Sequence, residues 1–147
     1  MAIIQSNWAL RRFTPPRPQS AGAVHVARFE FIFDRAVAIA GTDILELGVL
    51  PAFARVLDAT FIGQTALVGT ANIGIMSGEV GDPSAGRTVD ASLFAAADAN
   101  AAMTRMLLPT AFLLPAFGAD RSIGVTFSVA IPLLITRMVT LILEYEQ

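Results

Sequence analysis

Residues 23–33, AVHVARFEFIF, carry the clearest structural signal in the chain. Apolar and aromatic side chains fall at every second position up to Phe33, whereas Arg28 and Glu30 fall at positions between them. A period of two with aromatic and β-branched residues is typical of a strand with one buried face. The set predicted to share that face is His25, Ala27, Phe29, Phe31 and Phe33. The stretch therefore predicts a half-buried β-strand at the start of a β-rich body.

Further stretches of strand character follow along the chain. They are residues 53–63, 67–78, 121–130 and 136–147. The last two are predicted to form a closing strand pair. In the final stretch Val139, Leu141, Leu143 and Tyr145 share one face, and Met138, Thr140, Ile142, Glu144 and Glu146 share the other. The first of these faces is predicted to be buried, and the second to lead into solvent.

Residues 89–107 do not follow the strand pattern, because they are rich in alanine. Alanine has the highest intrinsic helix propensity, so this segment predicts a short helix or a long loop. Elsewhere strands recur with turns of glycine, proline and aspartate between them. We therefore expect a mostly β fold, an antiparallel β-sandwich or jelly roll.

The composition leaves more apolar surface than one small domain needs. Hydrophobic residues make up 54% of the 147 residues and charged residues 15%, against roughly 45–50% and about 25% in ordinary soluble domains. A membrane-spanning helix needs about 20 consecutive apolar residues, and the run from 106 to 119 contains Pro109 and Pro115. We expect no membrane span and no export signal. The surplus apolar surface favours contacts with other subunits.

Residues 1–21 differ from the rest of the chain. They contain three arginines, no acidic residue and a proline-rich stretch at residues 14–18. This composition predicts an extended basic arm, led by a short helix at residues 3–13, and a single β-sandwich domain at residues 22–147. The body contains the remaining seven arginines and all twelve acidic residues. The arm is therefore positive and the body negative, so the arm suits an acidic neighbour.

The stretch GDPSAGRT, residues 81–88, has the spacing of a phosphate-binding loop, with Arg87 where lysine is expected. A phosphate loop needs that lysine and a series of backbone N–H donors. Pro83 removes one donor, and Asp82 places a negative charge where phosphates would bind. Proline and glycine at these positions are typical of a turn. We predict a turn and no nucleotide binding.

No other pattern indicates catalysis or a cofactor. The chain has no cysteine and a single histidine, His25, which lies in a predicted strand. Ser84 has only one of the two glycines of a nucleophile elbow. Asp98 and Asn100 lack the glycine and distal glutamate of a calcium loop. We therefore predict a protein that is not an enzyme and that has no metal ion and no cofactor.

We predict that the N-terminal residues pack on a neighbouring protein, because their apolar side chains would otherwise be exposed to solvent. Aromatic residues beside arginines also fit nucleic acid. However, the basic residues are few and the acidic body opposes binding, so we expect no nucleic-acid partner. The predicted contact residues are Ile3, Trp8, Arg11, Arg12 and Phe13, with Asp82 and Arg87 from the turn.

Three stretches carry a resemblance to a known family. Residues 33–59, 72–88 and 120–130 resemble parts of small virion proteins of tailed bacteriophages, particularly capsid decoration or cement proteins. The resemblance implies a β-sandwich on the outside of the major capsid protein lattice, often trimeric, which clamps neighbouring capsomers. It implies no set of functional residues. Two alternatives stay open at this point: a tail or head-fibre structural protein, and a small-ligand-binding β protein.

Overall fold

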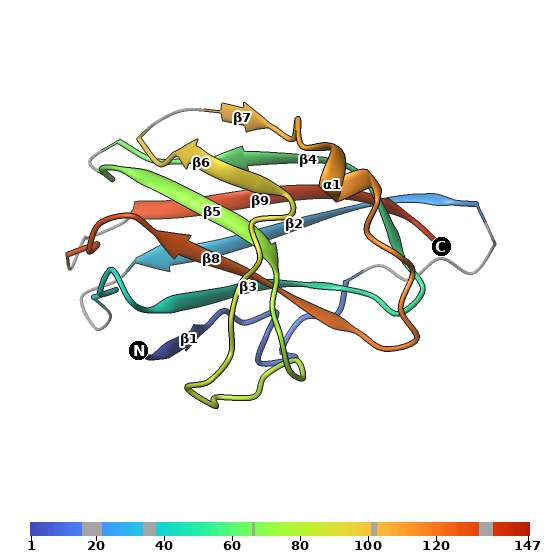
Figure 1. Cartoon of the computed structure of the whole chain (residues 1–147), viewed down its shortest axis with the longest axis horizontal. Helices are drawn as coiled ribbons and strands as arrows, with labels where there is room; N and C mark the ends of the chain where they lie inside the picture. Colours follow the sequence, from blue (N-terminus) through green and yellow to red (C-terminus); the bar gives the residue numbers. More distant parts are fainter. Residues whose placement is uncertain (16–21, 34–37, 66, 101–102, 133–136) are drawn as a thin grey trace.

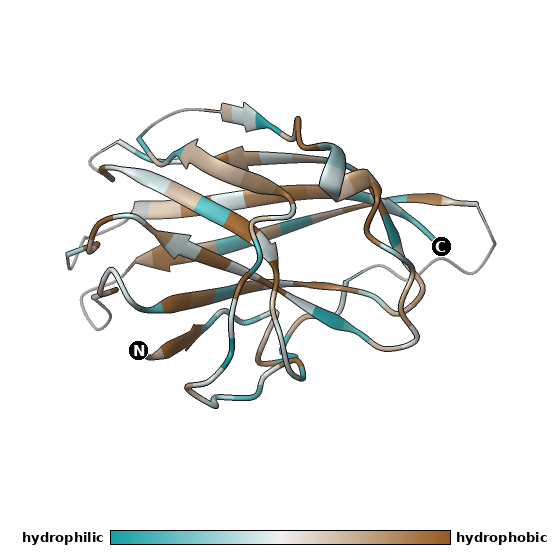
Figure 2. Cartoon of the chain, in the orientation of Figure 1, coloured by the Kyte–Doolittle hydropathy of each residue, from teal (hydrophilic) through white to brown (hydrophobic). Residues whose placement is uncertain are grey.

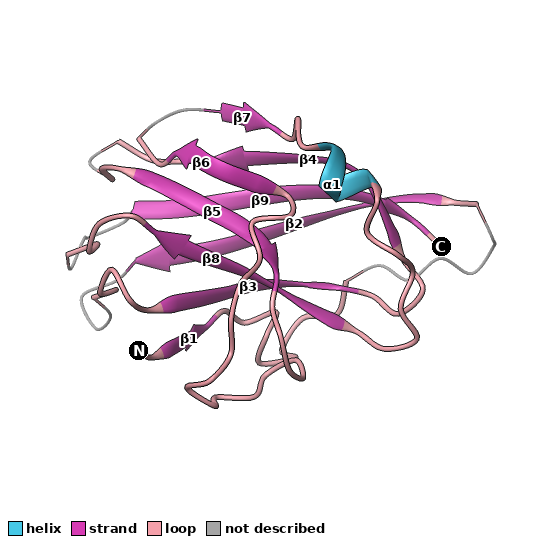
Figure 3. Ribbon diagram, viewed as in Figure 1, coloured by secondary structure: helices cyan, strands magenta, loops and turns pink. Residues whose placement is uncertain are grey.

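The computed structural model of the chain describes residues 1–15, 22–33, 38–65, 67–100, 103–132 and 137–147. Two β-sheets pack against each other (Figure 1). The five-stranded sheet contains, in spatial order, β1 (Ile3–Gln5), β3 (Ile44–Leu50), β8 (Arg121–Phe127), β5 (Thr70–Ile75) and β6 (Phe94–Asp98). The four-stranded sheet contains β2 (Val24–Phe33), β9 (Arg137–Glu146), β4 (Arg55–Ile62) and β7 (Met103–Arg105). One short helix, α1 (Pro109–Phe112), is drawn in Figure 3. The prediction of a mostly β sandwich is confirmed.

The strand pairing is that of a jelly roll. The antiparallel pairs β2/β9, β3/β8, β4/β7 and β5/β6 are nested one inside the other along the chain. Such nesting describes a long hairpin folded over itself into two sheets, the double-sheet architecture of jelly rolls. β1 is an addition to this core, because it extends the five-stranded sheet by pairing in parallel with β3.

The core lies between the two sheets and is apolar from both sides. The predicted face of β2 is directed inward, with Phe29 and Phe33 fully buried and Phe31 half-buried. On β9 the predicted inward set, Val139 to Tyr145 at alternate positions, is also fully buried. Figure 2 shows brown, hydrophobic residues along the strands of both sheets. The two-residue periodicity therefore predicted the inward faces of β2 and β9 correctly.

The helix or loop predicted for residues 89–107 was wrong, because β6 and β7 form there. β6 pairs with β5, and the Asn72 side chain accepts a hydrogen bond from the backbone N–H of Ala96 at 2.8 Å. Phe94 and Ala97 are buried in the core. Pairing with a neighbouring strand and burial thus override the local helix propensity of alanine.

The short helix predicted for residues 3–13 was also wrong. Residues 3–5 form β1, and residues 7–12 form turns that follow it. The Ser6 hydroxyl donates to the backbone carbonyl of Leu47 at 2.6 Å, which fastens the end of β1 to β3. Residues 1–15 therefore lie against the sandwich. The predicted domain boundary falls in residues 16–21, outside the described residues, and stays a prediction.

The predicted closing pair of the last two strands does not form. β8 lies between β3 and β5, whereas β9 lies between β2 and β4 in the other sheet. β3 was not predicted as a strand, because its sequence ILELGVL has no alternation. All seven of its residues are buried, including Glu46. A strand covered on both faces loses the period-two signal.

Candidate interaction surfaces

Arg87 lies in the interior of the protein, where only 3% of its surface is exposed. Its Nη1 lies 3.0 Å from Oε1 of Glu46, which is fully buried. Its Nη2 donates to the Ser122 hydroxyl at 2.8 Å, and its Nε donates to the backbone carbonyl of Ser77 at 2.7 Å. Nη1 also donates to the backbone carbonyl of Asp82 at 2.8 Å. Charge-assisted hydrogen bonds thus engage all three guanidinium nitrogens.

The Glu46 carboxylate is equally well satisfied. Besides Arg87, it accepts hydrogen bonds from the Gly81 backbone N–H at 3.0 Å, from the Gln5 amide at 2.9 Å and from the Ser122 hydroxyl at 2.5 Å. These contacts join the turn to β1, β3 and β8. We call the group of Glu46, Arg87 and Ser122 the buried polar cluster.

The predicted turn at residues 81–88 is present, and its arginine points inward. Asp82 accepts hydrogen bonds from the Ser84 hydroxyl and backbone N–H, and these bonds hold the pKa of the Asp82 carboxyl below its usual value. The prediction of Arg87 as a surface contact was wrong, because Glu46 and Ser122 hold the guanidinium inside. Asp82 remains half-exposed beside the turn, where a neighbour can reach it.

Four of the N-terminal contact residues, Trp8, Arg11, Arg12 and Phe13, lie close together in the segment that follows β1. The Trp8 ring lies 5.0 Å from the Phe29 ring of the core and 5.3 Å from the Phe13 ring, centroid to centroid. Trp8 is half-buried, whereas 54% of Phe13 is exposed. Ile3 is half-buried in β1. Trp8 therefore packs between Phe13 and the sandwich, and much of the Phe13 side chain stays exposed to solvent.

Two exposed arginines flank these rings. Arg11 has a left-handed backbone with φ of +57°, which is uncommon for a residue other than glycine. Arg12 donates through Nη1 to the Asn7 side chain at 3.1 Å. We call Trp8, Arg11, Arg12 and Phe13 the N-terminal cluster. Val80, next to the residue 81–88 turn, lines one small pocket together with Trp8 and Phe13, so this turn lies beside the cluster.

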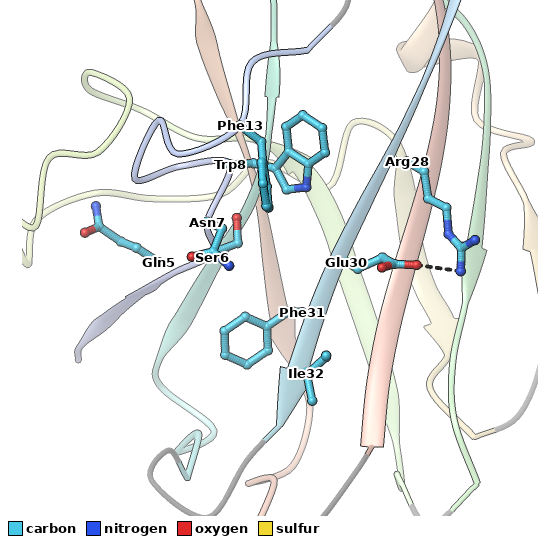
Figure 4. Close-up of a pocket in the computed structure, with 9 residues that line it drawn as sticks. All are labelled: Gln5, Ser6, Asn7, Trp8, Phe13, Arg28, Glu30, Phe31 and Ile32. Atoms are coloured by element: carbon cyan, nitrogen blue, oxygen red, sulfur yellow. Dashed lines mark ion pairs between the residues drawn. The ribbon is translucent and has the colours of Figure 1, made fainter.

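A groove of about 420 Å³ is lined by residues of the N-terminal segment and of β2. Figure 4 shows Trp8 and Phe13 close together on one side and the Arg28–Glu30 ion pair on the other. The lining residues are Gln5, Ser6, Asn7, Trp8, Phe13, Arg28, Glu30, Phe31 and Ile32. Charged, amide and aromatic groups are mixed along it, which fits a protein surface better than an enclosed ligand site.

A second exposed aromatic surface was missed in the sequence. Phe53, between β3 and β4, is 60% exposed and has φ of +63°. Its backbone N–H donates to the carbonyl of Phe117 at 2.7 Å, and the Phe117 ring lies 5.9 Å from the Arg121 guanidinium carbon. Burial lowers the pKa of Arg121. Phe112 and Leu113 are also exposed. The corresponding stretch of sequence is FLLPAF, residues 112–117. It is rich in bulky apolar residues, but it has no periodicity from which a surface could be predicted.

Within the described ranges, no three His, Cys, Asp or Glu side chains lie close enough to hold a metal ion. In that same part of the chain, no helix has the length and apolar character needed to cross a membrane.

The comparisons with known proteins point to phage capsids. No protein-family model and no curated protein matches the chain. A chain in the solved capsid of Ralstonia phage GP4 matches it with a TM-score of 0.87 and 32% identity, covering 99% of this chain and 98% of that one. A chain in the capsid asymmetric unit of cyanophage Pam1 shares the fold, with a TM-score of 0.56 and 18% identity over 96% of both chains. The protein therefore belongs to the family of the Ralstonia phage GP4 capsid chain and is a virion structural protein.

Proposed function

We propose that the protein is a capsid decoration, or cement, protein that binds the outside of the major capsid protein lattice and stabilises it. It acts as a homo-oligomer, with the trimer as the favoured form. The observation that carries the proposal is the N-terminal cluster, an exposed cationic and aromatic surface held on a sandwich whose core is complete in one chain. This role is consistent with the capsid family of the chain.

The complete core indicates that each chain folds before it binds the capsid. Large side chains from both sheets are fully buried within one chain, among them Phe29 and Phe61 of the four-stranded sheet and Ile123 of the five-stranded sheet. The buried polar cluster is also satisfied without a neighbour. A protein with such a core needs its partner for attachment and not for folding.

The N-terminal cluster has the chemistry of an attachment site. Interface energy concentrates in a few aromatic and arginine side chains, and Trp8, Arg11 and Phe13 gather in this way around one small pocket. The cluster carries one sign of charge, so it suits an acidic surface on the shell. Each attached copy stabilises the assembled lattice over its separated subunits by mass action, and many weak contacts add up over the shell.

Binding to empty phage heads tests this role. The purified protein should cosediment with heads, raise their melting temperature, and be located on their outer surface by electron microscopy. R11E and Phe13→Ala should each weaken binding about tenfold or more. R55E is the matched control, because Arg55 is also exposed and the net charge changes equally. Cosedimentation of R55E should equal that of the unaltered protein.

Several results would overturn parts of the proposal. A protein that does not bind heads, or that forms the shell itself, is not a decoration protein. Equal losses for R11E and R55E would remove the N-terminal cluster as the attachment site. A mass in solution that is not that of a trimer or of linked trimers would overturn the trimeric form. Ring or fibre symmetry in particles would indicate a tail or head-fibre protein instead.

A further inference from the structure

Within the part of the chain that the structure describes, the outer edge of β2 has no neighbouring strand. β2 has ten residues and lies at the end of the four-stranded sheet, where β9 is its neighbour. Among the described residues, no backbone group of β2 has a hydrogen-bond partner outside its ladder with β9. The groove of about 420 Å³ lies beside this edge and leaves space along it. A long exposed edge is a template for another strand, and native proteins protect or use such edges.

The outward face of β2 has the composition of a contact surface. Val26 is 53% exposed and Ile32 is 60% exposed, although both belong to a regular strand. Arg28 and Glu30 lie between them on the same face, with Arg28 Nη2 2.5 Å from Glu30 Oε1. Two apolar residues thus flank two charges of opposite sign around the middle of the strand.

This pattern is self-complementary. We propose that β2 pairs antiparallel with β2 of a second copy of the chain, about a two-fold axis at Phe29. In that register Arg28 lies opposite Glu30 of the partner subunit, and Val26 lies opposite Ile32 of the partner subunit. Opposite charges and apolar side chains placed directly across two strands stabilise the pairing. The two four-stranded sheets then form one sheet of eight strands.

Neighbouring registers are unfavourable. A shift by two residues in one direction places Arg28 opposite Arg28 of the partner subunit, and in the other direction it places the two copies of Glu30 opposite each other. Like charges directly across a ladder destabilise it. A shift by one residue would place the buried side chains of one β2 on the same side of the joined sheet as the solvent-exposed side chains of the other. Only the register centred on Phe29 pairs both charges.

The charges also indicate that the strand that pairs with β2 comes from a second copy of the chain. The N-terminal cluster carries one sign of charge and therefore repels its own copy. The edge of β2 carries both signs, symmetrically placed, so its best complement is itself. The inference holds for any virion structural role, because it concerns contact between copies and not attachment to the shell. Since a two-fold contact joins copies in pairs, in a trimeric protein it links one trimer to another and does not form the trimer itself.

Cysteine crosslinking tests the register directly, because the chain contains no native cysteine. In the proposed pair V26C faces I32C of the other copy, within the Cα separation of about 7 Å that a disulfide allows. Two copies of V26C, or two copies of I32C, place their thiols about 20 Å apart. An equal mixture of V26C and I32C should therefore crosslink at least tenfold more than either variant alone under mild oxidation.

A third variant supplies the matched control. Val68 is as exposed as Val26 but lies outside β2, so a mixture of V26C with V68C measures random collisions. If V26C with I32C crosslinks no more than this mixture, the proposal is overturned. If V26C or I32C crosslinks equally well alone, the strands pair in another register and the proposal is also overturned.

Charge reversal provides an independent measurement. R28E alone places acids opposite acids, and E30R alone places bases opposite bases, so each should raise the dissociation constant of self-association about tenfold or more. An equal mixture of R28E and E30R restores opposite charges across the ladder, while the pair within each chain stays broken. Recovery of association in this mixture supports the contact. Mixtures that stay as weak as the single variants overturn it.

Discussion

Arg87 and the pair Arg11 and Arg12 make an informative comparison, because all three were predicted to contact a partner. All three follow or occupy turns, and all three belong to a chain without lysine. The structure buries Arg87 among hydrogen-bond acceptors and leaves Arg11 and Arg12 exposed. A basic residue in a turn is therefore buried and structural where the fold brings an acidic side chain to it, and is free for a partner where it does not.

The partners of Arg87 explain its position. Glu46 and Ser122 are 41 and 35 residues away in the sequence, and β3 and β8 carry them side by side. Burying a charge is costly unless it is paired and hydrogen-bonded. Among the described residues, Arg12 finds the neutral Asn7 side chain and no carboxylate, so its guanidinium remains in water.

The largest effect is expected from Arg87→Ala. This change leaves the buried Glu46 carboxylate without its counter-ion, and breaking a buried pair in this way costs about 3–5 kcal/mol. Urea unfolding followed by circular dichroism should show the loss in the free energy of unfolding. Arg11→Ala is the control and should change little. A loss below about 1 kcal/mol for Arg87→Ala would contradict the closed cluster.

Trp8→Ala should have the next largest effect, about 2 kcal/mol, because the half-buried ring packs on Phe29 and a cavity would remain. The free energy of unfolding is again the measurement, by circular dichroism because Trp8 is the single tryptophan. Phe13→Ala is the comparison and should cost less than about 1 kcal/mol, since 54% of Phe13 is exposed. Equal losses would mean that Phe13 serves the core rather than a partner.

The double reversal R11E/R12E should leave the free energy of unfolding within about 0.5 kcal/mol of the unaltered protein, as is usual for surface changes. It should at the same time reduce binding to phage heads. Arg87→Ala, by contrast, should lower the free energy of unfolding strongly. A large loss of stability in R11E/R12E would remove the distinction between the exposed and buried arginines.

The smallest effect concerns Asp43, a half-exposed counterpart of Glu46. Hydrogen bonds from the backbone N–H groups of Ala2 and Ala40 hold the pKa of the Asp43 carboxyl below its ordinary value. The stabilisation is therefore present above about pH 4 and is lost as the pH falls through the lowered pKa. Asp43→Ala should cost about 0.5 kcal/mol or less at neutral pH. This difference should shrink in unfolding curves below pH 4, and a difference independent of pH would contradict the assignment.

Local pattern predicted the elements with one buried face. The inward-facing positions of β2 and β9 alternate with more accessible ones, so their positions and inward faces could be read from the residues. Thr140 of β9 is the exception, because it was predicted to lead into solvent and is buried. β3 could not be predicted in this way, because it is covered on both sides, nor could β6, whose alanines favour a helix in isolation. The N-terminal cluster was predicted as a group, since Trp8 to Phe13 are close in sequence. The surface around Phe53 was not, because Phe53 and Phe117 meet only through the folded loops.

The sequence by itself determined the β-rich class, the inward faces of the alternating strands and the absence of a recognisable catalytic pattern, because each depends on residue type and local spacing. Tertiary structure alone decided the sheet order, the burial of Arg87 and the free edge of β2. Each of these depends on which distant segments lie side by side. Pairing such as that of β3 with β8 joins residues more than 70 positions apart, and the free energy gained by satisfying Glu46 and Arg87 together exists only after that pairing forms.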